Sequence, residues 1–181
     1  MSKVKASDRL LWLDLEMTGL DPVHDRILEV AAIVTDWEFN ELGSYEAVVN
    51  QPDSVLESMD AWCTTQHGAS GLTERVKNSH LSETEVEAQL VAFAKEHCGD
   101  AEGVKTLLCG NSIHMDRRFL EQQWKAFDQL LHYRMLDVSA WKVVFEGKYK
   151  KRFVKPEEHR ALADIRGSIQ ELKYYLGKVK V

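Results

Sequence analysis

The run LLWLDLEMTG at residues 10–19 is apolar apart from two acids, and it ends in a Thr-Gly pair typical of a turn. It predicts a β-strand over about residues 9–17. Because side chains alternate between the two faces of a strand, Asp14 and Glu16 share one face with Trp12. The opposite face is wholly apolar and consists of Leu11, Leu13, Leu15 and Met17. Two neighbouring carboxylates repel each other and are costly to bury, and a bound cation would relieve both costs.

The chain of 181 residues, 44% of them apolar, is long enough for one domain with a substantial core. We expect a single domain over residues 1–181. No apolar run approaches the roughly 20 residues of a membrane helix, and the N-terminus lacks the apolar stretch of a secretory signal. Three cysteines without metal-site spacing favour reduced thiols and a cytoplasmic location. The net charge of -6 argues against a general polyanion-coating surface, but it is compatible with a small nucleic-acid ligand held by metal.

The remaining sequence predicts four further strands and a set of helices. Apolar or alternating patterns place the strands at 26–36, 44–50, 106–110 and 133–138. Helices are expected over 54–62, 70–76, 82–97 (opened by a Ser-x-x-Glu capping box), the later part of 111–124, 138–145 and 159–176. The basic segment 147–156 is expected to be a loop. Since short connections predict an antiparallel meander for the first three strands, the fold class is α/β, with a mixed five-stranded sheet covered by helices.

Three further polar residues are expected beside the first strand, because sites in such sheets lie at the carboxyl ends of strands. Asp116 follows the buried strand 106–110, although an acid here would equally suit a helix start. His159 and Asp164 lie five residues apart, roughly 500° of helix. They converge only if His159 lies at the end of the helix beside the basic segment. Taken alone, such a histidine is usually a surface residue, and an acid-x-acid pair usually lies on a solvated strand face.

Together these residues form a set of four carboxylates and one imidazole: Asp14, Glu16, Asp116, Asp164 and His159. An oxygen-rich site without thiolates favours Mg²⁺ or Mn²⁺. Two such ions about 4 Å apart promote in-line displacement at a phosphodiester, one by lowering the pKa of a water and the other by stabilising the leaving oxygen. A histidine with a pKa of about 6.5 suits the role of proton acceptor. The set therefore predicts a metal-dependent phosphodiester hydrolase.

The chain resembles the DEDDh 3′-to-5′ exonucleases, which have an RNase H-like fold, in its pattern Asp14-x-Glu16, Asp116 and His159-x4-Asp164. Within that superfamily it is similar to the oligoribonucleases through motifs that span nearly the whole chain. These motifs are WLDLEMTGLD at 12–21, HGASGL at 67–72, GNSI at 110–113, HYRMLDVS at 132–139 and the closing segment 159–164. The departures are small. His114 and Met115 stand where a Gly-Gln type pair is expected, and the basic stretch 147–155 differs in detail.

The resemblance implies a catalytic role for each member of the set. Asp14, Glu16 and Asp164 would hold a pair of Mg²⁺ or Mn²⁺ ions, Asp116 would complete the shell of the second ion, and His159 would be the general base. Water would attack the last phosphodiester, and a 5′-mononucleotide would leave from the 3′ end.

The resemblance also implies the substrate contacts at the base end. Leu20 and Trp62 resemble the family's base-wedging pair, and His67 would help to hold the base. An aromatic face stacks any base without reading sequence, so we expect weak sequence preference. Without the resemblance, Trp62 would equally suit a core position.

Ser112, Arg134 and Ser139 resemble the family's cap on the substrate's 5′ phosphate. A guanidinium and hydroxyls suit a terminal phosphate, which offers more acceptor oxygens than a diester. Such a cap would limit the enzyme to very short RNAs, with dinucleotides fitting best. Tyr133 is similar to the tyrosine that reaches the partner's active site in family homodimers, so a homodimer is implied. Arg134 by itself would equally suit a surface ion pair.

Two competing functions remain. One is a general DEDDh exonuclease that trims longer RNA or DNA 3′ ends; the absence of a long basic groove and the cap residues argue against it. The other is a non-catalytic nucleotide-binding module, which would not need five clustered ionisable groups. A series of substrate lengths separates these functions from cleavage of short oligoribonucleotides.

Overall fold

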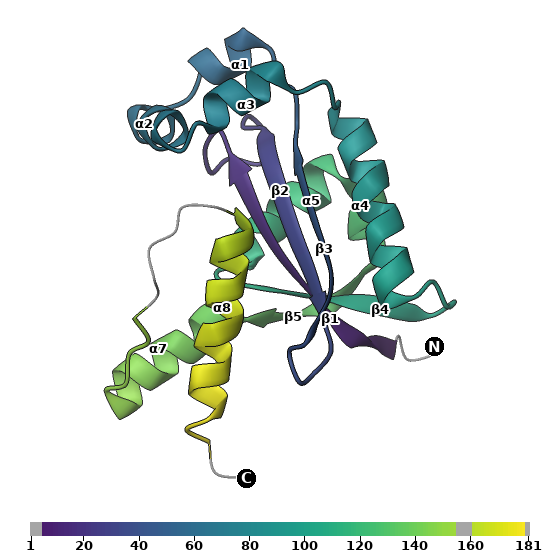
Figure 1. The fold of residues 1–181 in the computed structure, drawn as a ribbon, viewed down its shortest axis with the longest axis vertical. Helices are drawn as coiled ribbons and strands as arrows, with labels where there is room; N and C mark the ends of the chain where they lie inside the picture. Colours follow the sequence, from purple (N-terminus) through teal and green to yellow (C-terminus); the bar gives the residue numbers. More distant parts are fainter. Residues whose placement is uncertain (1–4, 155–160, 180–181) are drawn as a thin grey trace.

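The computed structural model describes residues 5–154 and 161–179, and a five-stranded mixed sheet lies at its centre (Figure 1). The strands are β1 Lys5–Met17, β2 Ile27–Thr35, β3 Glu41–Val48, β4 Val104–Gly110 and β5 Leu131–Asp137. They lie in the order β3-β2-β1-β4-β5, antiparallel among the first three and parallel from β1 through β4 to β5. The predicted α/β class, five strands and antiparallel meander are confirmed.

The helices of the described residues are α1 Asp53–Glu57, α2 Ala61–Ala69, α3 Leu72–Asn78, α4 Glu83–Cys98, α5 His114–Gln123, α6 Lys125–Asp128, α7 Val138–Tyr149 and α8 Ala161–Leu176. The prediction of one helix over 54–62 is wrong. Asp60 interrupts it as the N-cap of α2, because its carboxylate accepts the backbone N–H of Cys63 at 2.7 Å. The capping box of Ser82 and Glu85 is confirmed at the start of α4. α7 extends to Tyr149, into the segment expected to be a loop.

The alternation along β1 separates two cores, as the sequence predicts. Leu11, Leu13 and Leu15 belong to a core shared with α4, α5 and α6. Leu10 and Trp12 belong to the core on the other face, which α7 and α8 cover. Figure 1 shows α4 and α8 on opposite sides of the sheet. Because both faces of β1 are covered along its middle, polar groups on this strand are accessible only towards its two ends, with Lys5 and Asp8 at the start and Asp14 and Glu16 near the carboxyl end.

The parallel strands β1, β4 and β5 have their carboxyl ends on the same side of the sheet, and α8 also begins on this side (Figure 1). Gly110 ends β4 beside β1, and a Cβ at this position would lie 2.9 Å from the carbonyl oxygen of Leu13. A residue with a side chain would therefore push the two strand ends apart. No helix of the described residues is long and apolar enough to cross a membrane.

Candidate active site

Asp14 and Glu16 lie near the end of β1, half-buried, on the face that carries Trp12. Glu16 pairs in register with Glu29 of β2. Burial raises the pKa of Glu16, the charge of His67 opposes this, and the negative charges of Glu29 and Asp164 add to the increase. Several carboxylates therefore act on one another at this strand end, as the sequence predicts.

Asp116 lies in the first turn of α5, and the structure brings it against β1. Its Oδ1 accepts the backbone N–H of Leu15 at 3.0 Å, and the residue is only 8% exposed. Burial raises the pKa of Asp116 to about 7. Hydrogen bonds from the backbone N–H groups of Leu15 and of Asp116 itself oppose this increase, and the charges of Glu16 and Asp137 add smaller increases. Asp116 is therefore poorly solvated as an anion, which is the condition that a cation would relieve.

Asp164 lies in the first turn of α8, on the helix that packs over the Trp12 face of β1. Its charge raises the pKa of Glu16, which shows that the two carboxylates lie near each other. His159 lies outside the described residues, so its predicted role as general base stays a prediction.

A pocket of about 630 Å³ opens beside the end of β1, and Glu16, Leu20, Trp62 and His67 help to line it. Leu20 and Trp62 are 69% and 67% exposed, so neither belongs to a core. His67 is buried, and its Nε2 lies 2.9 Å from the carbonyl oxygen of Met17. A carbonyl only accepts, so Nε2 carries a hydrogen, and Nδ1 faces Glu16 at 4.0 Å. The structure thus gathers the predicted base-binding residues beside Glu16.

Ser112 and Ser139, two of the three predicted phosphate-cap residues, lie together where β4 and β5 end. Their hydroxyl oxygens are 3.1 Å apart. Among the described residues, no hydrogen bond or ion pair joins Arg134 to either serine. Its guanidinium carbon lies 5.4 Å from the centre of the Tyr133 ring. The structure therefore assembles the serine pair and leaves the arginine on the neighbouring strand.

Tyr133 lies on β5, the strand at one end of the sheet order. Its side chain is 69% exposed and its ring stacks on His132. A pocket of about 950 Å³ beside β5 includes Tyr133, Met135, Trp37 and Trp141. The edge strand thus presents one exposed aromatic side chain, Tyr133, next to a pocket that Trp37 and Trp141 also line, an arrangement suited to a partner surface.

An ion pair between a buried acid and a half-exposed arginine, which sequence reasoning missed, supports this strand end. Glu29 is 2% exposed and forms two hydrogen bonds with the guanidinium of Arg75 from α3. The only sequence signal is one acid inside the apolar run 27–35. Arg75 neutralises Glu29 directly beside Glu16, and its charge also lowers the pKa of Glu16.

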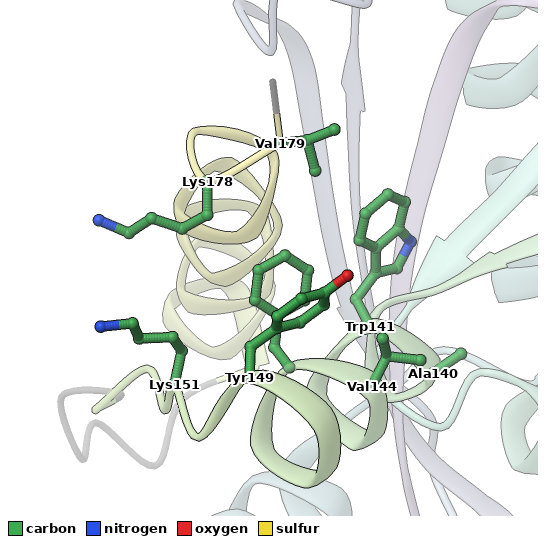
Figure 2. A pocket seen from close by; sticks show the side chains of 8 residues that line it. Ala140, Trp141, Val144, Tyr149, Lys151, Lys178 and Val179 are labelled. Carbon is green, nitrogen blue, oxygen red and sulfur yellow. The ribbon is translucent and has the colours of Figure 1, made fainter. Parts of the chain in front are cut away.

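A third cavity, of about 820 Å³, lies between α7 and the residues that follow α8. Trp141 and Tyr149 line it from α7 and Val179 from the end of the chain, while the amino groups of Lys151 and Lys178 point together away from Trp141 (Figure 2). Of the predicted site residues that the structure describes, none lines this cavity.

The donor chemistry of the four predicted ligands fits hard divalent cations, because all of them are carboxylates. The raised pKa values of Glu16 and Asp116 agree with a site that is electrostatically incomplete without positive charge. Within residues 5–154 and 161–179, no three or more His, Cys, Asp or Glu side chains lie close enough together to form a metal-binding group.

Comparison with known proteins gives the family. The sequence model of the Exonuclease family (RNase_T) matches residues 11–172. The oligoribonuclease of Marinobacter nauticus is 48% identical, over 93% of this chain and 94% of its own. The chain belongs to the oligoribonuclease family. A second member, from Coxiella burnetii, is 45% identical over 94% of this chain and 93% of its own.

Solved structures show the fold of this oligoribonuclease-family chain to be that of exonuclease I, which is RNase H-like. E. coli exonuclease I in complex with a 5cy-dT13 oligonucleotide has a TM-score of 0.72 at 18% identity, covering 95% of this chain and 41% of its own. Exonuclease I from Methylocaldum szegediense has a TM-score of 0.69 at 19% identity, covering 94% and 41%. The chain spans about two-fifths of exonuclease I.

Proposed function

We propose that this oligoribonuclease-family enzyme removes 5′-mononucleotides from the 3′ ends of oligoribonucleotides a few residues long, with dinucleotides as its best substrates. The observation that carries this proposal is the position of Asp116. Its buried carboxylate is hydrogen-bonded to β1 next to Glu16, beside a pocket that exposes Leu20 and Trp62. A charged hydrolytic centre and a base-stacking surface therefore lie side by side.

The proposed cofactors are two divalent cations, Mg²⁺ or Mn²⁺, held by Asp14, Glu16, Asp116 and Asp164. When bound, the ions would lower the pKa of a water and stabilise the leaving oxygen. The chain's own contribution is to hold Asp116 by the Leu15 N–H and to place α8, with Asp164, over the same face of β1.

We assign the general base to His159. In the sequence it precedes Asp164 by five residues, close to the acid whose charge acts on Glu16. A neutral imidazole takes a proton from water at neutral pH, which is the step a phosphodiester hydrolase needs at its nucleophile.

Substrate binding is assigned to two clusters. Leu20 and Trp62 would clamp a base, with His67 beneath them tied to the Met17 carbonyl. At the other end of the substrate, Ser112 and Ser139 would bind the terminal 5′ phosphate together with Arg134. This phosphate contact supports the preference for short RNA, because an internal diester offers fewer oxygens.

The quaternary structure, extent and location of the enzyme are also proposals. The exposed Tyr133 on the edge strand β5, beside the pocket lined by Trp37 and Trp141, supports a homodimer in which Tyr133 reaches the partner's site. One exonuclease domain would span residues 1–181. The free state of Cys63, Cys98 and Cys109 supports the cytoplasm as its location.

The test is a cleavage time course on 5′-phosphorylated RNAs from two to twenty nucleotides, with Mn²⁺ and with EDTA. A steep preference for the dinucleotide that EDTA abolishes supports the proposal. Equal rates at all lengths would leave a general exonuclease without a phosphate cap. Binding without cleavage by a folded protein would leave a nucleotide-binding module.

A further inference from the structure

Ser112 adopts a backbone conformation that a non-glycine residue rarely takes. Its φ is 49°, in the left-handed region. Its N–H donates to Oδ1 of Asp137 at 3.0 Å and to Oγ of Ser139 at 2.9 Å. Strained residues persist where the surrounding structure holds them, and they cluster at functional sites. The surrounding hydrogen bonds therefore hold the Ser112–Ser139 pair in place.

Asn111 contacts Ser139 of this pair, and the hydrogen bonds of its side-chain amide determine which way the amide oxygen and nitrogen point. Its Nδ2 lies 2.8 Å from Oγ of Ser168 and 3.3 Å from Oε2 of Glu171. Ser168 uses its only hydroxyl hydrogen on the carbonyl of Asp164 at 3.0 Å, so its Oγ accepts from Asn111. The carboxylate of Glu171 also accepts. Both partners require the NH₂ group, which leaves Oδ1 to face Ser139.

The other half of the amide holds the serine pair. The hydroxyl of Ser139 donates to Oδ1 of Asn111 at 3.3 Å, while its oxygen accepts the N–H of Ser112. One amide thus joins the Ser112–Ser139 pair, at the ends of β4 and β5, to α8 one turn beyond Asp164. These segments are far apart in the sequence, and their relative positions determine the distance between the two ends of a bound substrate.

Glu171 anchors this connection from inside the protein. It is 4% exposed, and its Oε1 accepts the hydroxyl of the fully buried Tyr175 at 2.9 Å. A buried carboxylate is costly unless it is well hydrogen-bonded, and none of the proposed catalytic steps uses Glu171. A leucine would fill this core position without the free-energy cost of burying a charge. The contact of Glu171 with Asn111 therefore explains the presence of a carboxylate here.

We propose that Asn111, anchored by the buried Glu171, is a positioning residue that fixes the Ser112–Ser139 pair relative to the Asp164 turn of α8 and thereby makes the site selective for 5′-phosphorylated dinucleotides. This inference rests on the proposed function. The side-chain amide of Asn111 is hydrogen-bonded to Ser168, Glu171 and Ser139. It acts through the serines and through Ser168.

The experiment compares the kcat/KM for a 5′-phosphorylated dinucleotide with that for the same dinucleotide bearing a 5′ hydroxyl. Their ratio does not change when part of the enzyme is inactive, so a merely structural defect leaves it unchanged. In Asn111→Ala we expect this ratio to fall roughly tenfold, the equivalent of one hydrogen bond to a charged group. The loss should appear chiefly as a higher KM for the phosphorylated substrate.

Glu171→Gln keeps the shape of the anchor while weakening its acceptor, and it provides the test if Asn111→Ala does not fold. We expect its ratio to fall in the same direction by a smaller factor. Glu41→Gln is the matched control, because Glu41 binds α8 through Arg166 on the exposed side, away from the serines. It should keep the wild-type ratio.

The outcomes separate the two levels of the proposal. Suppose that the wild type prefers the phosphorylated dinucleotide and that folded Asn111→Ala and Glu171→Gln variants keep this preference. That result overturns the positioning role and leaves the proposed function intact. A wild-type enzyme that cleaves both dinucleotides equally overturns the phosphate cap and the positioning role together. No cleavage by the wild type overturns the proposed function itself.

Discussion

Replacing Asp116 by asparagine should stabilise the metal-free protein, although it should remove the catalytic site's function. The carboxylate is 8% exposed, and burial raises its pKa from 3.8 to about 7. Since one pKa unit is worth about 1.4 kcal/mol, the ionised side chain costs the folded state roughly 4 kcal/mol at pH 7 and above. Asparagine keeps the oxygen that accepts the Leu15 N–H.

The net gain is smaller than the electrostatic cost. The new NH₂ group of asparagine needs a partner, and a buried donor left without one costs about 1–2 kcal/mol. We therefore expect Asp116→Asn to raise the free energy of unfolding by roughly 2–3 kcal/mol near pH 8 in EDTA. In a protein of this size that is an increase of about 5–10 °C in Tm.

The sign follows from proton linkage. A carboxyl whose pKa is raised on folding stabilises the folded state below its unfolded pKa of 3.8 and loses this contribution as the pH rises to about 7. The difference between Asp116→Asn and wild type should therefore grow from about pH 4 to about pH 7 and then stay level. Added Mn²⁺ should reverse the order, because the ion stabilises only the protein that binds it.

The assay is thermal unfolding in EDTA and in Mn²⁺ at several pH values, with Asp8→Asn as the control. The side chain of Asp8 is 91% exposed, so this variant removes one negative charge without relieving burial. An Asp116→Asn protein that is less stable than wild type at pH 8 in EDTA, or a difference that does not depend on pH, would refute the reasoning.

Three other outcomes follow from the structure. Trp62→Ala should raise the KM for a dinucleotide by roughly tenfold, because one stacked base is worth about 1–3 kcal/mol. It should not lower Tm, because the side chain is 67% exposed. Trp62→Phe should restore most of the affinity, and equal KM values for all three proteins would remove Trp62 from the base site. Arg75→Met should lower the free energy of unfolding by roughly 2–3 kcal/mol in chemical denaturation, since it leaves the carboxylate of Glu29 buried and unpaired. The double variant with Glu29→Gln should recover part of that loss. The absence of any recovery would contradict the pairing of Arg75 with Glu29 as the source of the stability. His159→Ala should lower kcat and abolish the decline in rate of the wild type below about pH 6–7, and a wild-type pH–rate profile in the variant would exclude His159 as the base.

The sequence alone was sufficient for features that depend on local pattern. Alternation along β1 predicts which side chains face each core, and the two apolar clusters confirm it. Short connections predict the antiparallel meander, and the Ser82–Glu85 capping box marks the start of α4. The acids were recognisable because a carboxylate in an apolar strand or directly after one needs a special reason to be there.

Features that depend on long-range packing required the tertiary structure. The interruption of the 54–62 helix depends on whether Asp60 accepts a backbone N–H, which the amphipathic pattern does not contain. Glu29 finds Arg75 across 46 residues, and Asn111 finds Glu171 across 60.

The properties of the site are decided at the same level. The amino acid at position 116 was evident from the sequence, but its raised pKa arises because the packing of α5 against β1 buries the carboxylate, and the hydrogen bond from the Leu15 N–H offsets only part of this effect. Burial and charge proximity are properties of the packed chain. The sequence therefore determined which chemistry the protein carries, and only the packing of segments distant in the chain decided the environment in which those groups act.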